Sequence, residues 1–223
     1  MSKGFEWAYD LNGSKVPIIK PFVIPTATVI EQGEVVLHTP GTGIAVVAGT
    51  DFDDPVMGVA INAHAANSGT EIKVSASPTA VYSHGCGNTI TATGGSTTTF
   101  VVAGLLPQTD NLWIGGYIKI ISCAADSSLN GTKIKITDSE GSSGTLTFST
   151  QAAAFASGDT AYLCPGKLAI GEYGWDLDSD GMNVDWDTSG GSAWTLVDTD
   201  AENMRSFWMS RLHQFGNYPK TLD

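Results

Sequence analysis

GTKIKITDSEGSSGTLTFST, residues 131–150, decides the fold class of this chain. Before its Gly/Ser-rich centre, Ile134 and Ile136 alternate with polar residues, and after it Leu146 and Phe148 do the same. Because successive side chains of a strand point to opposite faces of a sheet, this alternation on both sides of a turn is typical of a β-hairpin. We therefore predict two antiparallel strands joined by a tight turn.

Short apolar runs bounded by glycine, proline or aspartate recur along most of the chain. Of its 223 residues, 26 are glycine and only 15% are charged, a composition that favours strands and turns over surface helices. We predict a mainly β fold, built as a small β-barrel or β-sandwich. The expected strands lie within residues 29–38, 43–49, 56–63, 71–77, 77–83, 89–105, 113–122, 133–149 and 159–166.

Residues 1–25 are expected to form an extended N-terminal arm. Its glycines and prolines interrupt any regular element, yet it is too apolar for a tail surrounded by water. An apolar arm needs a surface to lie on, which is either its own domain or a partner. The apolar residues at issue are Phe5, Trp7, Ile18, Ile19, Phe22 and Ile24.

A helix is predicted near the end of the chain, from about Asp200 to Phe215. Thr199 and Glu202 have the spacing of a capping box, and Gly216 is placed to end the helix. A strand is the alternative, since Trp208 and Leu212 can also share one face at period two. The residues at helical spacing are Met204, Phe207, Trp208, Leu212 and Phe215.

The acidic stretch WDLDSDGMNVDWD, residues 175–187, has two interpretations. Its D-x-D-x-D-G pattern has the spacing of a calcium-binding loop, but Asp187 stands where such loops carry a bidentate glutamate. The alternative is a hairpin with its turn at Asp180-Gly181, in which Leu177 faces Val184. That hairpin has a place for every residue, and we favour it.

The same hairpin would put two aspartates opposite each other, Asp176 and Asp185. Like charges that face each other across two strands are mildly destabilising unless they are solvated or bridged by a cation. We therefore expect no dedicated cofactor, with a weak cation site, calcium in particular, as the alternative. Its ligands would be Asp176, Asp178 and Asp185.

Charge and motifs argue against several functional classes. The net charge is -12, from 23 acidic residues and 11 lysines and arginines, and no basic stripe is present, so we expect no nucleic-acid partner. No apolar run has the length of a membrane-spanning helix or of a signal peptide, so no membrane partner is expected. Common catalytic motifs are absent and the four histidines lie far apart, so we expect no enzyme activity.

The three cysteines, Cys86, Cys123 and Cys164, are an odd number without C-x-x-C spacing. A chain of this length can form a core without a disulfide framework. From the residues alone, we expect buried free thiols.

Two blocks of the sequence resemble proteins of tailed-phage particles. Residues 33–83, with GEVV at their start and GVA at Gly58–Ala60, resemble the head decoration proteins, the family of the bacteriophage lambda one. Residues 94–166 are similar to a β module of phage virion proteins, through GGSTTTF, WIGGYI, the ITDSEG hairpin and GDTAY. The RLHQFGN segment at 211–217 looks like the closing segment of several phage head proteins.

This resemblance implies an arrangement of domains. A decoration domain with a small barrel or tulip-like form would comprise residues 26–85 and 166–223, preceded by the arm at 1–25. An all-β domain at 86–165 would be inserted into it. Cys86 and Cys164 would then lie at the two ends of the insertion and near each other, and could form a disulfide only after release from the reducing cell.

The resemblance also implies a function. The chain would be a structural protein of the virion, made in the host cytoplasm, that binds the outer capsid surface and stabilises the head without catalysing a reaction. Its partners would be the major capsid protein and two further copies of itself in a homotrimer. Because an apolar arm needs a surface to lie on, we expect its six apolar residues to be the ones that contact the capsid. The alternative is an adhesin on the virion surface, whose inserted domain recognises a host glycan or surface.

Overall fold

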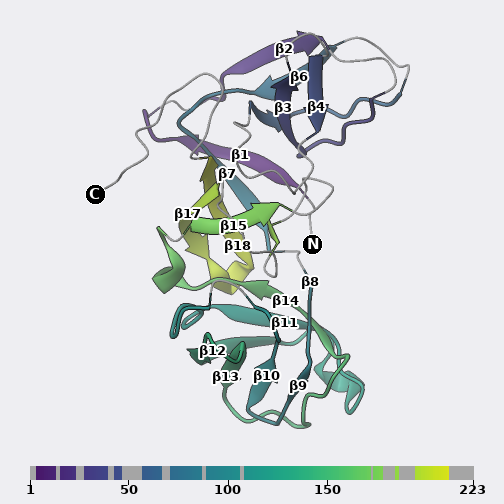
Figure 1. The fold of residues 1–223 in the computed structure, drawn as a ribbon, viewed down its shortest axis with the longest axis vertical. Coiled ribbons are helices and arrows are strands. Elements are labelled where there is room, and N and C mark those ends of the chain that lie inside the picture. Colours follow the sequence, from purple (N-terminus) through teal and green to yellow (C-terminus); the bar gives the residue numbers. More distant parts are fainter. Residues whose placement is uncertain are drawn as a thin grey trace.

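The computed structural model describes residues 4–13, 16–23, 28–39, 43–46, 57–66, 71–86, 89–105, 108–171, 173–177, 184–185 and 194–210. Within these ranges the fold is mainly β, as predicted, and its three antiparallel sheets follow one another along the long axis of the molecule (Figure 1). None of these sheets closes into the barrel that was also expected. No described helix is long and apolar enough to cross a membrane.

The middle sheet collects strands from distant parts of the chain. All of its strand pairs are antiparallel, and its buried side chains include Phe5, Tyr82, Trp194 and Trp208. In spatial order its strands are β1 (Phe5–Asp10), β7 (Ala80–Gly85), β18 (Arg205–Ser210), β17 (Trp194–Asp200), β15 (Tyr173–Leu177) and β16 (Val184–Asp185).

A five-stranded sheet lies at one end of the molecule (Figure 1). It has a core of its own, which includes Val36, Met57 and Ile72. The sheet curls, so that its two edge strands approach each other without pairing. In spatial order its strands are β2 (Ile19–Val23), β6 (Glu71–Ser75), β5 (Gly58–Ala60), β3 (Val35–Thr39) and β4 (Gly43–Val46).

Gly33 helps to join this sheet to the middle sheet. Its carbonyl accepts a hydrogen bond of 2.8 Å from the Phe5 amide, and its own amide donates to the Ala60 carbonyl at 2.8 Å. Its φ of +89° is costly for other residues, and a Cβ there would lie 3.1 Å from the Phe5 nitrogen. A glycine therefore lets β1 approach the five-stranded sheet closely.

The seven strands between residues 89 and 164 pair only with one another among the described strands. The decisive hairpin is confirmed as β12 (Lys133–Glu140) and β13 (Thr145–Phe148), with a bulge between Ile136 and Asp138. The complete spatial order is β8 (Thr89–Thr91), β14 (Thr160–Cys164), β11 (Tyr117–Ser122), β12, β13, β10 (Thr99–Val101) and β9 (Gly94–Gly95).

The edge strands of this sheet, β8 and β9, are successive segments of one stretch of chain. Between them, the Ala92 amide donates to Asp159 next to β14, and the Thr93 amide donates to Val101 in β10, each at 2.8 Å. One stretch of chain therefore forms both edges of the sheet, which curls so that residues 92 and 93 lie between its two ends.

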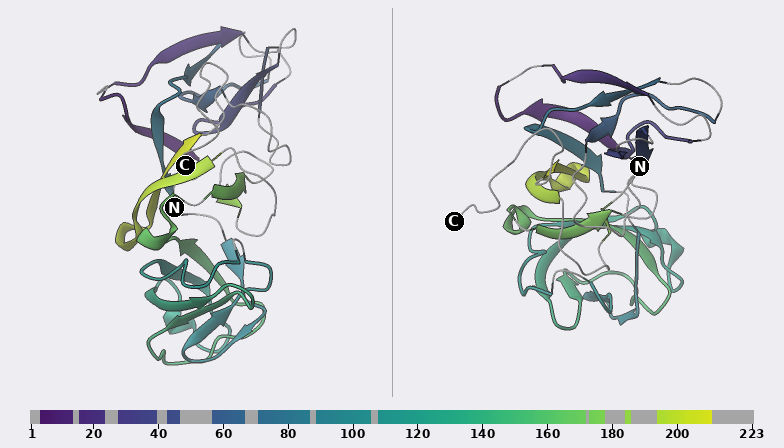
Figure 2. Two further views of the ribbon diagram at one scale, coloured as in Figure 1. Left: turned by 60° about the vertical axis from the view of Figure 1, so that its left-hand side comes forward. Right: turned by 45° about the horizontal axis from the view of Figure 1, so that its top comes forward.

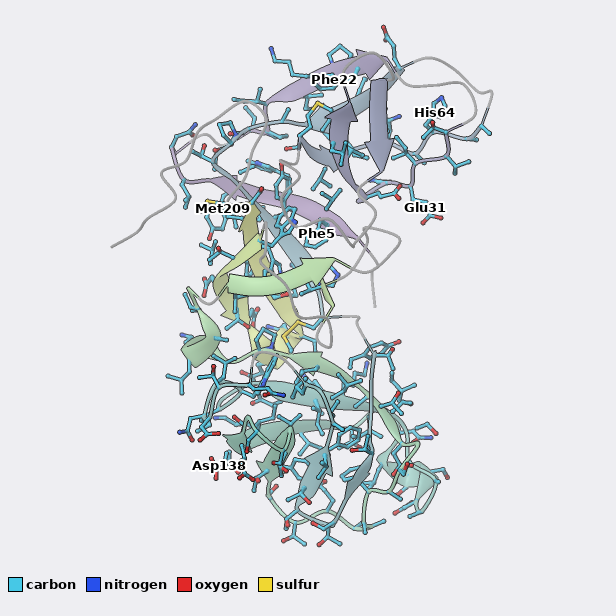
Figure 3. The ribbon with its side chains drawn as sticks, in the orientation of Figure 1. Phe5, Phe22, Glu31, His64, Asp138 and Met209 are labelled. Carbon is cyan, nitrogen blue, oxygen red and sulfur yellow. A yellow bond between two sulfur atoms is a disulfide. The ribbon has the colours of Figure 1, made fainter. Side chains whose placement is uncertain are left out.

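Two cysteines join the ends of this seven-stranded segment. Cys86 and Cys164 form a disulfide, with their Cα atoms 5.2 Å apart, in the region where the middle sheet meets the seven-stranded sheet (Figure 3). Both are buried, together with Ala201 and Met204. The expectation of free thiols is therefore wrong for these two residues and correct for Cys123, which is free and buried. Their closeness agrees with the implication of the phage resemblance.

The helix predicted from Asp200 to Phe215 is wrong for the described part of that range. A single turn of 3-10 helix, η3 (Ala201–Asn203), is followed directly by strand β18. Met204 ends the turn with a left-handed φ of 55°, and the Asp200 carboxylate caps its start in place of Thr199. Thr199 instead donates to the Pro165 carbonyl at 2.8 Å. Residues 211–215 of the predicted helix lie outside the described residues.

Two strands lie within the segment predicted to be an extended arm. β1 pairs with β7, and β2 pairs with β6 as an edge strand (Figures 1 and 2). Pro21 in β2 agrees with an edge position, because proline has no amide hydrogen to donate to a second neighbour. Of the two surfaces considered for the arm, its own fold therefore holds these strands.

Tyr82 also connects the middle sheet to the five-stranded sheet, and from its burial we predict a loss of stability at alkaline pH. Its hydroxyl donates to the Ser75 carbonyl at 2.8 Å, and burial raises the pKa of this phenol well above its ordinary value of 10.0. Above about pH 10 the unfolded chain releases the proton while the folded protein retains it, so the free energy of unfolding falls as pH rises. Urea unfolding between about pH 9 and pH 11 should show a shallower fall in Tyr82→Phe. An equal fall in both proteins would contradict this role.

Candidate functional site

Exposed apolar side chains gather in the N-terminal part of the chain. Among the described residues seven large hydrophobic side chains are exposed, and five of them lie between residues 11 and 29. Exposed apolar residues that occur singly are normal, so the concentration of five of the seven within residues 11–29 makes this part of the chain a candidate interaction region. We call these five the apolar N-terminal group: Leu11, Val16, Ile18, Ile19 and Val29.

Two members of the apolar N-terminal group are predicted contact residues. Ile18 is 42% exposed and Ile19 is 46% exposed, although their backbones are held by β6 and the residue after it. The Ile18 carbonyl accepts from the Ala76 amide at 2.9 Å, and Ile19 is paired with Ser75. A fixed backbone presents these side chains at little further cost in conformational entropy, which favours binding.

The structure places the other predicted contact residues differently. Phe5 is 1% exposed and stacks on Trp194 with ring centroids 5.1 Å apart, so it belongs to the core and not to the surface. Trp7 is half-buried and packs against the same core. Phe22 is half-buried against the core of the five-stranded sheet (Figure 3), and Ile24 lies outside the described residues.

Sequence reasoning did not select Leu11, Val16 and Val29. Val16 could have been selected from the sequence, because it stands beside Pro17 in the same apolar run as Ile18. Leu11 follows a strand of the middle sheet, and Val29 precedes the bridge between Ile30 and His64, so their exposure depends on pairing between distant segments. The periodicity of the sequence carries no signal for such pairing.

The acidic stretch forms the predicted hairpin in the residues that can be compared. β15 and β16 pair with Asp176 opposite Asp185 and Leu177 opposite Val184, which is the predicted register. Asp178 and the predicted turn lie outside the described residues. Among the described residues, no group of three or more His, Cys, Asp or Glu side chains could hold a metal ion. The weak cation site stays a prediction.

This register predicts how the protein responds to calcium and to removal of one charge. Because Asp176 and Asp185 are cross-strand neighbours, Asp176→Asn should raise the free energy of unfolding by about 0.2–1 kcal/mol. The melting temperature of the unsubstituted protein should be the same in calcium and in chelator, measured by differential scanning calorimetry. A calcium-dependent rise that Asp176→Asn removes would establish the cation site instead.

Comparisons of the chain with models of protein families, with curated proteins and with solved structures find no match. A functional proposal therefore rests on the residues and surfaces of the chain itself.

Proposed function

We propose that this chain is a structural protein of a tailed-phage head, which binds the outer surface of the capsid and stabilises it. The observation that carries the proposal is the apolar N-terminal group, four of whose five members lie in the arm at residues 1–25, the segment that we expect to contact the capsid. Its partner is the major capsid protein, and the chain acts without catalysing a reaction. In finer detail, the decoration domain comprises residues 26–85 and 166–223, and residues 86–165 are its insertion.

The arrangement of the sheets at the two ends of the molecule supports this proposal. The five-stranded sheet, whose edge strand β2 carries Ile19, lies at one end of the molecule, and the seven-stranded sheet lies at the other (Figure 1). A capsid protein bound at the first end leaves the second end directed away from the shell. The negative charge of -12 agrees with a surface that keeps many neighbouring copies soluble.

Many copies on a symmetrical shell would compensate for a modest contact by each one. Complete burial of a fully exposed isoleucine side chain contributes about 1.5–3 kcal/mol. Ile18 and Ile19 expose 42% and 46%, so together they supply a useful but limited affinity. Association of three chains into a homotrimer would multiply that affinity, since the second and third contacts become intramolecular. The proposal therefore includes a homotrimer on the virion surface.

Replacing Ile18 and Ile19 by aspartate tests the proposal. The double variant should lower binding to heads stripped of this protein by at least about tenfold, because each substitution replaces apolar contact area by a charge without a partner. Co-sedimentation of the purified protein with stripped heads measures the bound fraction. The backbone hydrogen bonds that hold this segment do not involve these side chains.

Leu168→Asp is the matched control, because Leu168 is 60% exposed and lies on η2 (Lys167–Ala169), outside the N-terminal segment. This variant should bind stripped heads as well as the unsubstituted protein. If no protein binds such heads, the proposed function fails. If all three proteins bind equally, the capsid contact does not involve Ile18 and Ile19.

A further inference from the structure

A pocket of about 510 Å³ lies between the middle sheet and the seven-stranded sheet. One wall comes from the start of β1, the end of β7 and the turn from η3 into β18. The other comes from β11 and from the residues that begin β12. Its polar lining includes Glu6, Ser83, Lys119, Lys133, Asn203 and Arg205.

The pocket is cationic, although the protein as a whole is strongly acidic. Three cations, Lys119, Lys133 and Arg205, line it together with one carboxylate, that of Glu6. The whole chain has 23 acidic residues and 11 lysines and arginines, so an excess of cations in one pocket runs against its composition. At physiological ionic strength charges are screened beyond about 8 Å, so a bound group would be influenced mainly by these nearby cations.

Two of the cations are cross-strand neighbours. Lys119 in β11 pairs with Lys133 in β12, so two ammonium-bearing side chains occupy directly opposed positions. Such a pair of like charges is destabilising by itself, and an anion between them turns the repulsion into two attractions. The pairing therefore favours a negatively charged ligand at this point of the sheet.

Lys133 and Arg205 donate hydrogen bonds to neutral oxygens. Lys133 Nζ donates to the main-chain carbonyl of Glu202, and Arg205 Nη2 donates to Ser83 Oγ at 2.9 Å. These bonds hold both side chains at the boundary between the two sheets without neutralising their charge. A guanidinium has five N–H donors, so Arg205 retains donors for an oxyanion.

A second pocket at the same boundary lacks the excess of positive charge that the first pocket has. It has a volume of about 470 Å³, and its charged residues are Lys135 and Lys167 with Asp200 and Glu202. Two cations are thus balanced by two carboxylates. This charge-balanced pocket is similar to the cationic pocket in volume and lies at the same boundary between sheets, so its lysines provide matched control substitutions.

We propose that the cationic pocket binds an acidic saccharide, a sugar that carries a carboxylate, sulfate or phosphate group. Its volume is that of a small-molecule site and is larger than one inorganic anion requires. Lys119, Lys133 and Arg205 receive the oxyanion. The Asn203 amide nitrogen donates to the Asp200 carboxylate, so its Oδ1 is the atom that offers an acceptor to the hydroxyl groups of the ring. This inference does not rest on the proposed capsid role, because it concerns the opposite part of the middle sheet.

Isothermal titration calorimetry of the full chain tests the inference. The probes are glucuronate, glucose 6-sulfate and glucose 6-phosphate, with glucose and inorganic phosphate as comparisons. At least one acidic sugar should bind with a Kd below about 1 mM, and its affinity should fall as sodium chloride is raised. The probe that binds identifies the oxyanion. Glucose should not bind, and inorganic phosphate should bind more weakly than the sugar.

Variants then locate the binding. Lys119→Gln with Lys133→Gln should weaken it at least about tenfold with little change in the melting temperature, because relief of the like-charge pair offsets the lost hydrogen bond from Lys133 to the Glu202 carbonyl. Lys135→Gln with Lys167→Gln makes the same change in net charge within the charge-balanced pocket and should leave binding unchanged. The inference is overturned if no acidic sugar binds, if inorganic phosphate binds as tightly as the sugars, or if both double variants lose binding equally.

Discussion

Trp208→Ala is expected to lower the free energy of unfolding by about 3–5 kcal/mol. Trp208 is fully buried in β18, and its cross-strand neighbours are Tyr82 in β7 and Leu196 in β17. Truncation removes the buried ring and leaves a cavity between three strands of the middle sheet. It also removes the hydrogen bond of 2.8 Å that the indole donates to Ser206 Oγ. Chemical denaturation monitored by circular dichroism measures the loss.

Met209→Ala is the control for this prediction, because Met209 is the next residue and is only half-buried. In a strand these two side chains lie on opposite faces, so Met209→Ala should cost clearly less. Phe207→Ala, on the same face as Met209, should resemble it. Equal losses of unfolding free energy from all three substitutions would contradict the alternation of buried and half-buried side chains along β18, and with it the assignment of β18 as a strand.

Removal of the Cys86–Cys164 disulfide is expected to lower the free energy of unfolding by an amount similar to that for Trp208→Ala. The two cysteines are separated by 78 positions, and closing a loop of that length lowers the entropy of the unfolded chain by an amount worth about 4–5 kcal/mol. The variant Cys86→Ser with Cys164→Ser should lose up to this amount, measured by urea denaturation without reducing agent. Its native strands should remain, because both sheets have core residues that do not involve sulfur.

Cys123→Ser provides the control, since Cys123 is buried but forms no disulfide. Reducing agent should destabilise the unsubstituted protein and the Cys123→Ser variant, and should not affect the double variant. Mass spectrometry of the intact oxidised chain should show the loss of two hydrogen atoms relative to the reduced chain. An unchanged mass and an unchanged stability on reduction would contradict the disulfide.

Local periodicity was enough to predict many of the strands. The hairpin of β12 and β13 was predictable because its alternation and its turn lie within one short stretch. The register of Asp176 opposite Asp185 followed in the same way from the position of a single turn. In both cases the paired residues are close in sequence, so the turn alone fixes which residues face each other.

The failures have a common physical cause, which is pairing between distant segments. Residues 205–210 have a spacing that suits a helix, but β7 and β17 flank them on both sides and impose an extended backbone. β1 was predicted as part of an extended arm and not as a strand, because its partner, β7, lies about seventy residues away. Tertiary pairing of this kind overrides local propensity.

In the candidate sites, too, local features could be predicted from the sequence and features that depend on distant segments could not. Ile18 and Ile19 could be selected because proline-rich apolar segments stand out in a sequence, whereas the burial of Phe5 depends on Trp194 and His84. The cationic pocket could not be predicted, since Lys119, Lys133 and Arg205 come from three separate strands. A sequence without a basic stripe can therefore still contain a local excess of positive charge.

The copy number of the chain in purified phage particles is the most direct test of the proposed function. Quantitative mass spectrometry with isotope-labelled peptides gives this number relative to the major capsid protein. A protein that decorates the whole shell follows the symmetry of the capsid, so we expect on the order of hundreds of copies per particle. About a dozen copies or fewer would instead fit a component at a single vertex and would contradict decoration of the capsid surface.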